Sequence, residues 1–117
     1  MEAHAAAPRP RILLANEPRS YREAIAHVLR VLRPGVEVAE TEATTLDREL
    51  RRGVPRLVIC SRATPAVRDA APAWVELYTD HGALSSVVVG REKTTVQRME
   101  LADILLVVDR ALSPVCL

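Results

Sequence analysis

The chain has few of the side chains that build metal centres, disulfide frameworks or aromatic cores. Its 117 residues include two cysteines, three histidines, one Trp, two Tyr and no Phe. Cys60 and Cys116 lie far apart, and the histidines share no ligand spacing, which argues against structural disulfides and metal binding. A Gly-rich phosphate loop is also missing. We therefore expect no metal, no cofactor and a core built from aliphatic side chains.

Long apolar runs and blocks of one charge are missing as well. No window of the sequence approaches the roughly 18 apolar residues of a membrane-spanning helix, and residues 1–10 lack the basic leader of a signal peptide. The net charge is +1, and no basic cluster is interleaved with aromatic residues. These features argue against a membrane partner and against direct nucleic-acid binding, and they predict a cytoplasmic protein.

The residues that are present alternate between strand and helix patterns. Strands are expected at residues 11–16, 36–41, 56–61, 74–79 and 85–90, and helices at 21–32, 44–53 and 100–112. Pro65 and Pro72 limit residues 64–73 to less than two helical turns. The length suits one domain, so we expect a frayed tail over residues 1–10, a single domain over 11–112 and a short tail over 113–117.

The order of these elements predicts an α/β fold with three layers. Strand–helix–strand–helix–strand favours a mostly parallel five-stranded sheet with right-handed crossovers. The five residues of "DHGAL" between the fourth and fifth strands are too few for a parallel crossover. Those two strands are therefore antiparallel or not neighbours, or a helix has been lost between them. Residues 94–97 can add a further strand by pairing back as a hairpin.

Two helices have a clear apolar stripe that is expected to face the core. On residues 21–32 the stripe comprises Tyr21, Ile25, Val28, Leu29 and Leu32. On residues 100–112 it comprises Leu101, Ile104, Leu105, Val108 and Leu112. Leu106 and Val107 fall outside the second stripe.

Four stretches of the chain resemble the receiver domain of bacterial response regulators. The receiver's first strand and helix are matched by "RILLANEPRSYREAIAHVL", its third strand by "RLVICSRATP", its fourth strand by "WVELYT" and its last helix by "ELADILLVVDRAL". The resemblance spans residues 11–112. It implies a flavodoxin-like fold with a phosphorylation pocket at the carboxyl edge of the sheet.

The resemblance also implies that phosphoryl transfer has been lost. The receiver's acidic pair falls on Ala15–Asn16 or Asn16–Glu17, so at most one carboxylate remains. The phosphoacceptor position falls on Ser61, and the switch hydroxyl is matched by Thr79. Gly90–Arg91 stands near the place of the receiver's lysine. Because phosphoryl transfer to a carboxylate needs the acceptor, a metal-binding acid pair and cations, this set of residues predicts an inert pocket.

The side chains at this edge can have structural roles or chemical ones. Cys60 is expected to be a small buried apolar side chain, and the hydroxyl of Thr64 or of Ser61 is expected to cap the turn that follows the strand. A hydrolase that uses Ser61 with His81 is a minor alternative, because the chain has no "GxSxG" motif. A small anionic ligand is a further alternative at this edge. It would bind to arginines there, namely Arg19, Arg22, Arg62 and Arg91.

The short connection after the fourth strand has a consequence for interactions. In receivers a helix at this place covers one face of the sheet, so the face that carries Trp74 and Tyr78 is expected to be partly uncovered. With Leu106 and Val107 on the last helix, these side chains predict an interface. A homodimer is the expected assembly, and another signalling protein is the second expected partner. The turn over residues 90–93 fits a dimer arm, a lid or a surface turn equally well.

These observations together favour binding over catalysis. The expected function is that of a phosphorylation-incompetent, receiver-like interaction module in bacterial signalling that self-associates and is not an enzyme. The alternative is a flavodoxin-like regulatory domain that binds a small anionic ligand at the carboxyl edge of the sheet.

Overall fold

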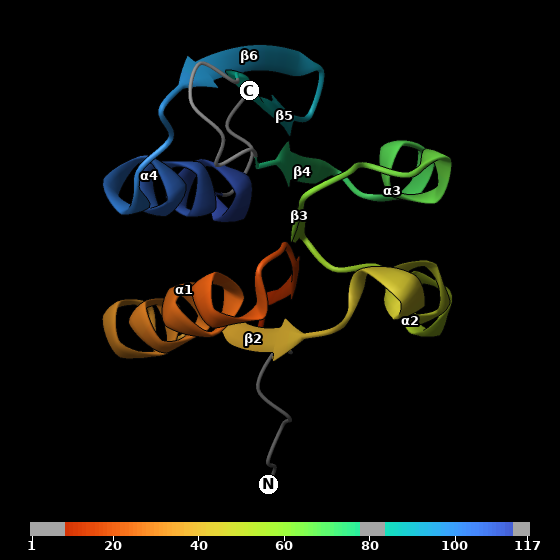
Figure 1. The fold of residues 1–117 in the computed structure, drawn as a ribbon, viewed down its shortest axis with the longest axis horizontal. Coiled ribbons are helices and arrows are strands. Elements are labelled where there is room, and N and C mark those ends of the chain that lie inside the picture. The colour runs from red at the N-terminus through yellow and green to blue at the C-terminus, as the bar shows by residue number, and fades with distance from the viewer. Residues whose placement is uncertain (1–8, 78–83, 114–117) are drawn as a thin grey trace, which may run out of the picture.

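Strands and helices alternate along the chain in the computed structural model, which describes residues 9–77 and 84–113 (Figure 1). In chain order the elements are β1 (Arg11–Ala15), α1 (Arg19–Leu32), β2 (Glu37–Glu40), the 3₁₀ turn η1 (Ala43–Thr45), α2 (Leu46–Arg52), β3 (Leu57–Cys60), α3 (Pro65–Ala70), β4 (Ala73–Glu76), β5 (Leu84–Val89), β6 (Glu92–Gln97) and α4 (Leu101–Leu112). The α/β class expected from the sequence is confirmed. None of the helices in this part of the chain is long and apolar enough to cross a membrane.

The sheet is mixed and has six strands in the order β2-β1-β3-β4-β5-β6. The first four strands are parallel to one another, whereas β5 is antiparallel to β4 and β6 is antiparallel to β5. The sheet is therefore mixed and not the mostly parallel five-stranded one expected, although two of the arrangements left open are found, antiparallel pairing of β4 with β5 and an added hairpin strand, β6. The physical reason is the short connection of residues 77–83, since a parallel crossover needs about a dozen residues or more.

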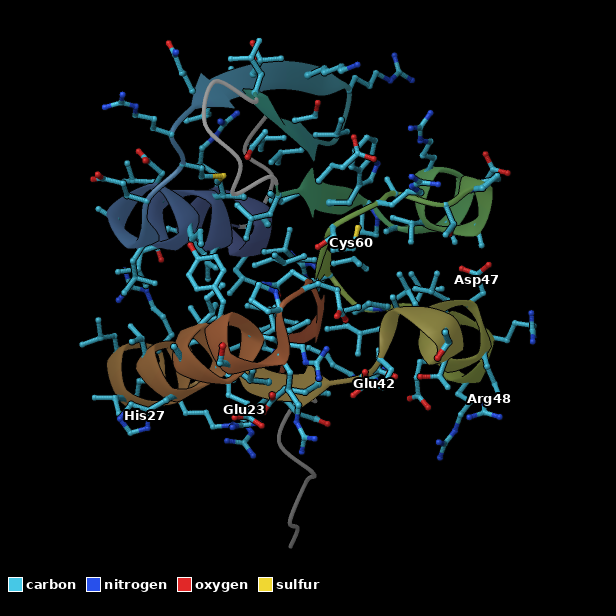
Figure 2. All side chains as sticks on the ribbon, in the orientation of Figure 1. Glu23, His27, Glu42, Asp47, Arg48 and Cys60 are labelled. Atoms are coloured by element: carbon cyan, nitrogen blue, oxygen red, sulfur yellow. The ribbon has the colours of Figure 1, made fainter. Side chains whose placement is uncertain are left out.

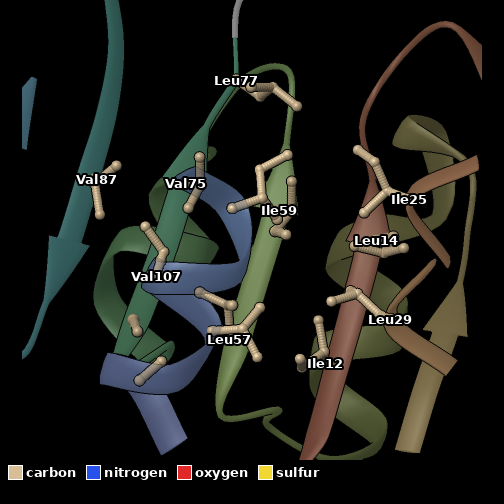
Figure 3. Close-up of a cluster of buried hydrophobic side chains, with 14 of the residues drawn as sticks. Ile12, Leu14, Ile25, Leu29, Leu57, Ile59, Val75, Leu77, Val87 and Val107 are labelled. Carbon is tan, nitrogen blue, oxygen red and sulfur yellow. The ribbon is translucent and has the colours of Figure 1, made fainter. Parts of the chain in front are cut away.

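Helices cover both faces of the sheet, with α1 and α4 on one face and α2 and α3 on the other (Figure 1). Side chains that alternate along each strand pack into one of two aliphatic clusters, because successive residues point to opposite faces. On the α1–α4 side the cluster is built around Ile12, Leu14, Leu57, Ile59 and Val75 (Figure 3). On the α2–α3 side it is built around Leu13, Val58, Cys60, Val67 and Trp74.

Helix α1 is rotated relative to the face that its sequence predicts. The side chains that it buries are Arg22, Ile25, Ala26 and Leu29. Leu32, which was expected in the core, is 48% exposed. The rotation brings a guanidinium group into the interior, where several carboxylates are available to pair with it.

Helix α4 shows the same kind of shift. Its buried residues are Ile104, Val107, Val108 and Ala111, whereas Leu106 is 62% exposed. A helix with apolar residues on most of its surface has no unique core face in its sequence. Packing on β5 and a bidentate ion pair to α1, from Arg33 Nε and Nη2 to the Asp109 carboxylate at 2.7 and 2.8 Å, accompany this orientation.

Helix α3 is short, as its flanking prolines predict, yet it has a well-formed start. The Thr64 hydroxyl accepts a hydrogen bond from Val67 N at 3.2 Å, and Pro65 occupies the first turn. Arg68 of this helix lies over the Trp74 ring, with its guanidinium carbon 5.7 Å from the ring centroid. The helix therefore covers the only tryptophan of the chain.

Candidate functional site

The carboxyl ends of β1 and β3 bring together three residues that the sequence singled out. Ala15 pairs with Cys60 in the sheet, so Asn16 and Ser61 follow at adjacent strand ends. The backbone N–H of Glu17 donates a hydrogen bond to Ser61 Oγ at 2.8 Å. Ser61 is thus engaged as an acceptor that holds the β1–α1 loop against the end of β3. Open α/β folds commonly bind ligands at such a strand edge, where neighbouring crossovers lead to opposite faces.

Asn16 is the unusual member of this group. Its side chain is fully buried, and neither its amide nitrogen nor its amide oxygen has a hydrogen-bond partner in the structure as described. A buried polar group without a partner costs about 1–3 kcal/mol. The edge therefore retains an uncompensated donor and acceptor at the position where the receiver resemblance places an acid.

Arg22 is the second buried polar residue near this edge, and only 3% of its side chain is exposed. Its guanidinium donates to the Glu42 carboxylate at 3.0 Å and to the Glu17 carboxylate at 3.4 Å. Glu40 Oε1 lies 3.9 Å from Arg22 Nε. A buried charge is tolerated only when it is paired, and these three glutamates supply the pairing. Arg22 is therefore already neutralised and has little capacity for an added anion.

Two pockets open beside these residues. The larger, of about 410 Å³, lies between α1 and the end of β2, and its lining is highly charged, with Arg19, Arg22, Glu23, Glu40, Thr41, Glu42 and Thr45. The smaller, of about 160 Å³, lies beside Ser61 and has a mostly apolar lining of Ala15, Ala43, Leu46, Cys60, Ser61, Arg62 and Thr64. Figure 2 shows Cys60 at the sheet between α2 and α3, and Glu42 where the chain leaves β2.

The cationic edge expected from four arginines is assembled only in part: Arg19 and Arg22 line the larger pocket, and Arg62 lines the smaller one. Arg22 is paired as described, and Arg19 pairs with Glu23 at 3.0 Å on the surface of α1. Arg91 lies at the opposite edge, because β5 is antiparallel and its end, Val89, pairs with Ala73 at the start of β4. The expectation that Arg91 approaches the carboxyl edge is therefore wrong.

Cys60 is buried as expected, and its environment keeps the thiol protonated. Burial, with a smaller effect from the negative charge of Glu76, raises the pKa of Cys60 to about 12. The thiol donates to Val75 O at 3.5 Å. A reactive cysteine needs the opposite environment, with a lowered pKa and access to solvent. Among the described residues no group of three or more His, Cys, Asp or Glu side chains is arranged to hold a metal ion.

Glu76 is a site residue that sequence reasoning missed. It is buried at the end of β4, where Glu76 Oε2 accepts a hydrogen bond from Ala63 N at 2.8 Å. Arg68 lies 3.9 Å away. The carboxylate thus fixes the loop after β3 that carries Ser61. Its position on the same strand face as Trp74 was the available signal, because a lone acid on a covered strand face needs a partner.

The expected interface residues divide into three groups. Trp74 and Val107 are buried, with 7% and 6% exposure, so the expectation that they form a surface is wrong. Trp74 is covered by α3, and Val107 faces the core because of the rotation of α4. Leu106 is exposed as expected. Tyr78 lies outside the described residues, as do two residues expected in other roles, Thr79 as the switch hydroxyl and His81 as the partner of Ser61.

The surface that is uncovered lies on β5 and β6 instead. Helix α3 covers β3 and β4, and no helix in the described parts of the chain follows β4 on that face (Figure 1). Trp74 lies opposite Val88 in the sheet, so both side chains point to the α2–α3 side. Every second residue of β5, with its partners on β6, points to the same uncovered side. This set, the hairpin face, comprises Leu84, Ser86, Val88, Lys93, Thr95 and Gln97. All of its β6 members are exposed, and Leu84 is 50% exposed.

Comparison of the chain with family models, with curated proteins and with solved structures finds no match in any of the three.

Proposed function

We propose that this chain is a receiver-like protein-interaction module of bacterial signalling that self-associates and does not transfer phosphoryl groups. The observation that carries the proposal is the β5–β6 hairpin, whose α2–α3 side is not covered by any helix of residues 9–77 and 84–113. An edge strand with an uncovered face is a common site of protein association. Apolar Leu84 and Val88 lie there beside polar Lys93 and Thr95, a mixture that fits a protein contact.

The chemistry of the carboxyl edge favours binding over turnover. Ser61 stands at the position that matches the phosphoacceptor, and its hydroxyl accepts a hydrogen bond from a backbone N–H. The thiol of Cys60 is held in its protonated form by burial. Neither side chain has an activating base among its described partners, and nucleophilic catalysis needs one. We infer a binding role for the module, with its output passed on by contact.

The proposal is tested by measuring the solution mass of the full chain by light scattering across a wide concentration range. We expect the mass to rise from monomer to dimer. Leu84→Glu should shift this transition to higher concentration, because it places a charge in the uncovered hairpin face. Leu106→Glu is the matched control, since Leu106 is exposed to a similar degree on α4. A monomeric mass over the whole range contradicts the proposal, and an effect of Leu106→Glu alone moves the contact to α4.

The second candidate function is that of a flavodoxin-like regulatory domain that binds a small anionic ligand at the carboxyl edge. The unpartnered amide of Asn16 near the pocket beside Ser61 is the observation that favours it. The paired state of Arg22 counts against a highly charged ligand. Thermal shift measurements with nucleotides and cyclic dinucleotides test it, with Asn16→Leu as the variant in which a specific shift should disappear. If none of these compounds changes the melting temperature, they are not ligands of this site and this second function is rejected for that class of compound.

A further inference from the structure

The outer edge of β6 exposes a defined set of backbone groups. Only two residues, Gly90 and Arg91, connect β5 to β6, and Gly90 has a φ of 62° that suits the first central position of such a turn. In a two-residue hairpin the flanking residues form a hydrogen-bonded pair, so Val89 pairs in this way with Glu92. The next residue, Gly90, points the other way, because its N–H donates to Pro72 O on the side of β4. Both observations give the same alternation of backbone direction along β5.

It follows that the N–H and C=O groups of Glu92, Thr94 and Val96 point toward β5. Those of Lys93, Thr95 and Gln97 point away from the sheet, because the direction alternates along a strand. No hydrogen bond to these outward groups occurs within the described residues. Thus β6 offers three donors and three acceptors on one open edge.

The other edge of the sheet is partly blocked by a side chain. Glu37 N, at the start of β2, donates to Pro10 O just before β1, and Thr41 N, just after β2, donates to Leu14 O of β1. The carbonyl of Val38 therefore points outward, because the direction alternates along a strand. Arg30 Nη2 donates to that carbonyl at 3.0 Å. A side chain that blocks an outward backbone group is one way in which proteins prevent edge pairing. Of the two edges, β6 therefore has the longer run of outward backbone groups and none of them is blocked by a described side chain.

We propose that β6 pairs with β6 of a second copy of this chain, antiparallel and centred on Thr95. This inference rests on the proposed function, because it names the partner and the geometry of the self-association. With Thr95 opposite Thr95, Lys93 of each copy lies opposite Gln97 of the other. This register alone places all three outward residues of one copy against the outward residues of its partner, and it satisfies all six backbone groups on each side. It is symmetric about a twofold axis, as a closed homodimer requires.

The charges along the strand agree with this register. Each Lys93 faces a neutral Gln97, and Thr95 faces Thr95, so no two like charges of β6 lie opposite each other. A shift that centres the pair on Lys93 would place two lysines opposite each other, which is unfavourable. The register centred on Thr95 is therefore self-complementary in backbone groups and free of like-charge contacts along β6.

Disulfide trapping tests the register directly. Residues opposite each other in a hydrogen-bonded antiparallel pair have Cα atoms about 5.5 Å apart, which a disulfide spans. In a Cys116→Ser background, Thr95→Cys should give a covalent dimer under mild oxidation. Gln97→Cys is the matched control, because its two copies would lie roughly 13 Å apart and should not cross-link. Lys93→Cys combined with Gln97→Cys should cross-link again.

A proline at residue 95 tests the backbone contact. Thr95→Pro removes an outward N–H and none of the bonds to β5, so the folded monomer should keep its circular dichroism spectrum. We expect its dimer dissociation constant to rise about tenfold or more, because both central hydrogen bonds are lost.

The outcomes separate this inference from the broader proposal. A dimer that persists unchanged in Thr95→Pro, or that traps Gln97→Cys as readily as Thr95→Cys, overturns the β6 pairing and leaves self-association standing. A chain that stays monomeric at every concentration and never cross-links at residue 95 overturns both. Trapping of Thr95→Cys alone, with weakened association of Thr95→Pro, supports the register.

Discussion

The buried thiol of Cys60 makes the stability of the protein sensitive to alkaline pH in a way that can be calculated. In the folded chain the pKa of Cys60 is raised to about 12, from an ordinary value of 9.0, mainly by burial. The unfolded chain therefore loses the thiol proton at lower pH than the folded chain does. A raised folded pKa contributes stability that is complete below the unfolded pKa and is lost as pH rises toward the folded pKa.

The size of the effect follows from the two pKa values. At about 1.4 kcal/mol for each unit of pH, the interval from 9.0 to about 12 corresponds to a total loss of about 4 kcal/mol. Near pH 10 the unfolded thiol is about 90% ionised while the folded thiol is still protonated, so the loss is about 1.4 kcal/mol relative to about pH 8. That is a large fraction of the stability of an ordinary small domain.

The assay is urea unfolding of the chain and of its Cys60→Ala variant at these two pH values, both in the Cys116→Ser background. The variant has its own stability at neutral pH, so the quantity compared is the change between the two pH values. All other titrating groups, including Tyr21, whose pKa burial also raises, are common to both proteins and cancel. An equal loss of stability in the two proteins would refute the reasoning, because Cys60 would then titrate alike in the folded and unfolded chains.

Three further predictions concern single contacts. The hydrogen-bonded Arg33 guanidinium lowers the pKa of Asp109. The stability that this ion pair contributes is therefore complete above the ordinary carboxyl pKa and is lost as the pH falls through the lowered value. The free energy of unfolding, measured over the acid range, should depend less on pH in Asp109→Asn than in the native chain. Glu76→Ala should be about 1–3 kcal/mol less stable than Glu76→Gln in urea, because only the alanine leaves the buried Ala63 N–H without an acceptor. Asn16→Leu should unfold at a higher temperature than the native chain, by roughly 1 kcal/mol of stability, and a lower temperature would show that the amide has a partner in solution.

Much of the fold could be predicted from local patterns. Apolar runs and punctuating prolines marked the first four strands, and the short connection after β4 limited the possible arrangements of β5. The choice among those arrangements could not be made, because the pairing of β4 with β5 is a nonlocal contact. The extra strand was expected over residues 94–97 and begins at Glu92, since the turn needs only Gly90 and Arg91.

The helix faces show why the candidate site was harder to predict. Ranking by hydrophobicity placed Leu32 in the core, where the structure exposes it, and did not include Arg22 in the buried stripe. The structure buries Arg22 because Glu17, Glu40 and Glu42 surround it, and these residues come from separate segments of the chain. Strand alternation correctly placed Trp74 and Glu76 on one face. Alternation carries no information about what covers that face, so the role of α3 was missed.

The position of Trp74 gives this protein an optical property of practical value. The only tryptophan of the chain lies on the α2–α3 side of the sheet, beneath Arg68. Its fluorescence therefore reports on that side alone, whereas far-ultraviolet circular dichroism is dominated by the long helices α1 and α4 on the other. Following both signals in one unfolding experiment compares the two sides of a single sheet, and different midpoints would mean that one layer comes apart before the other.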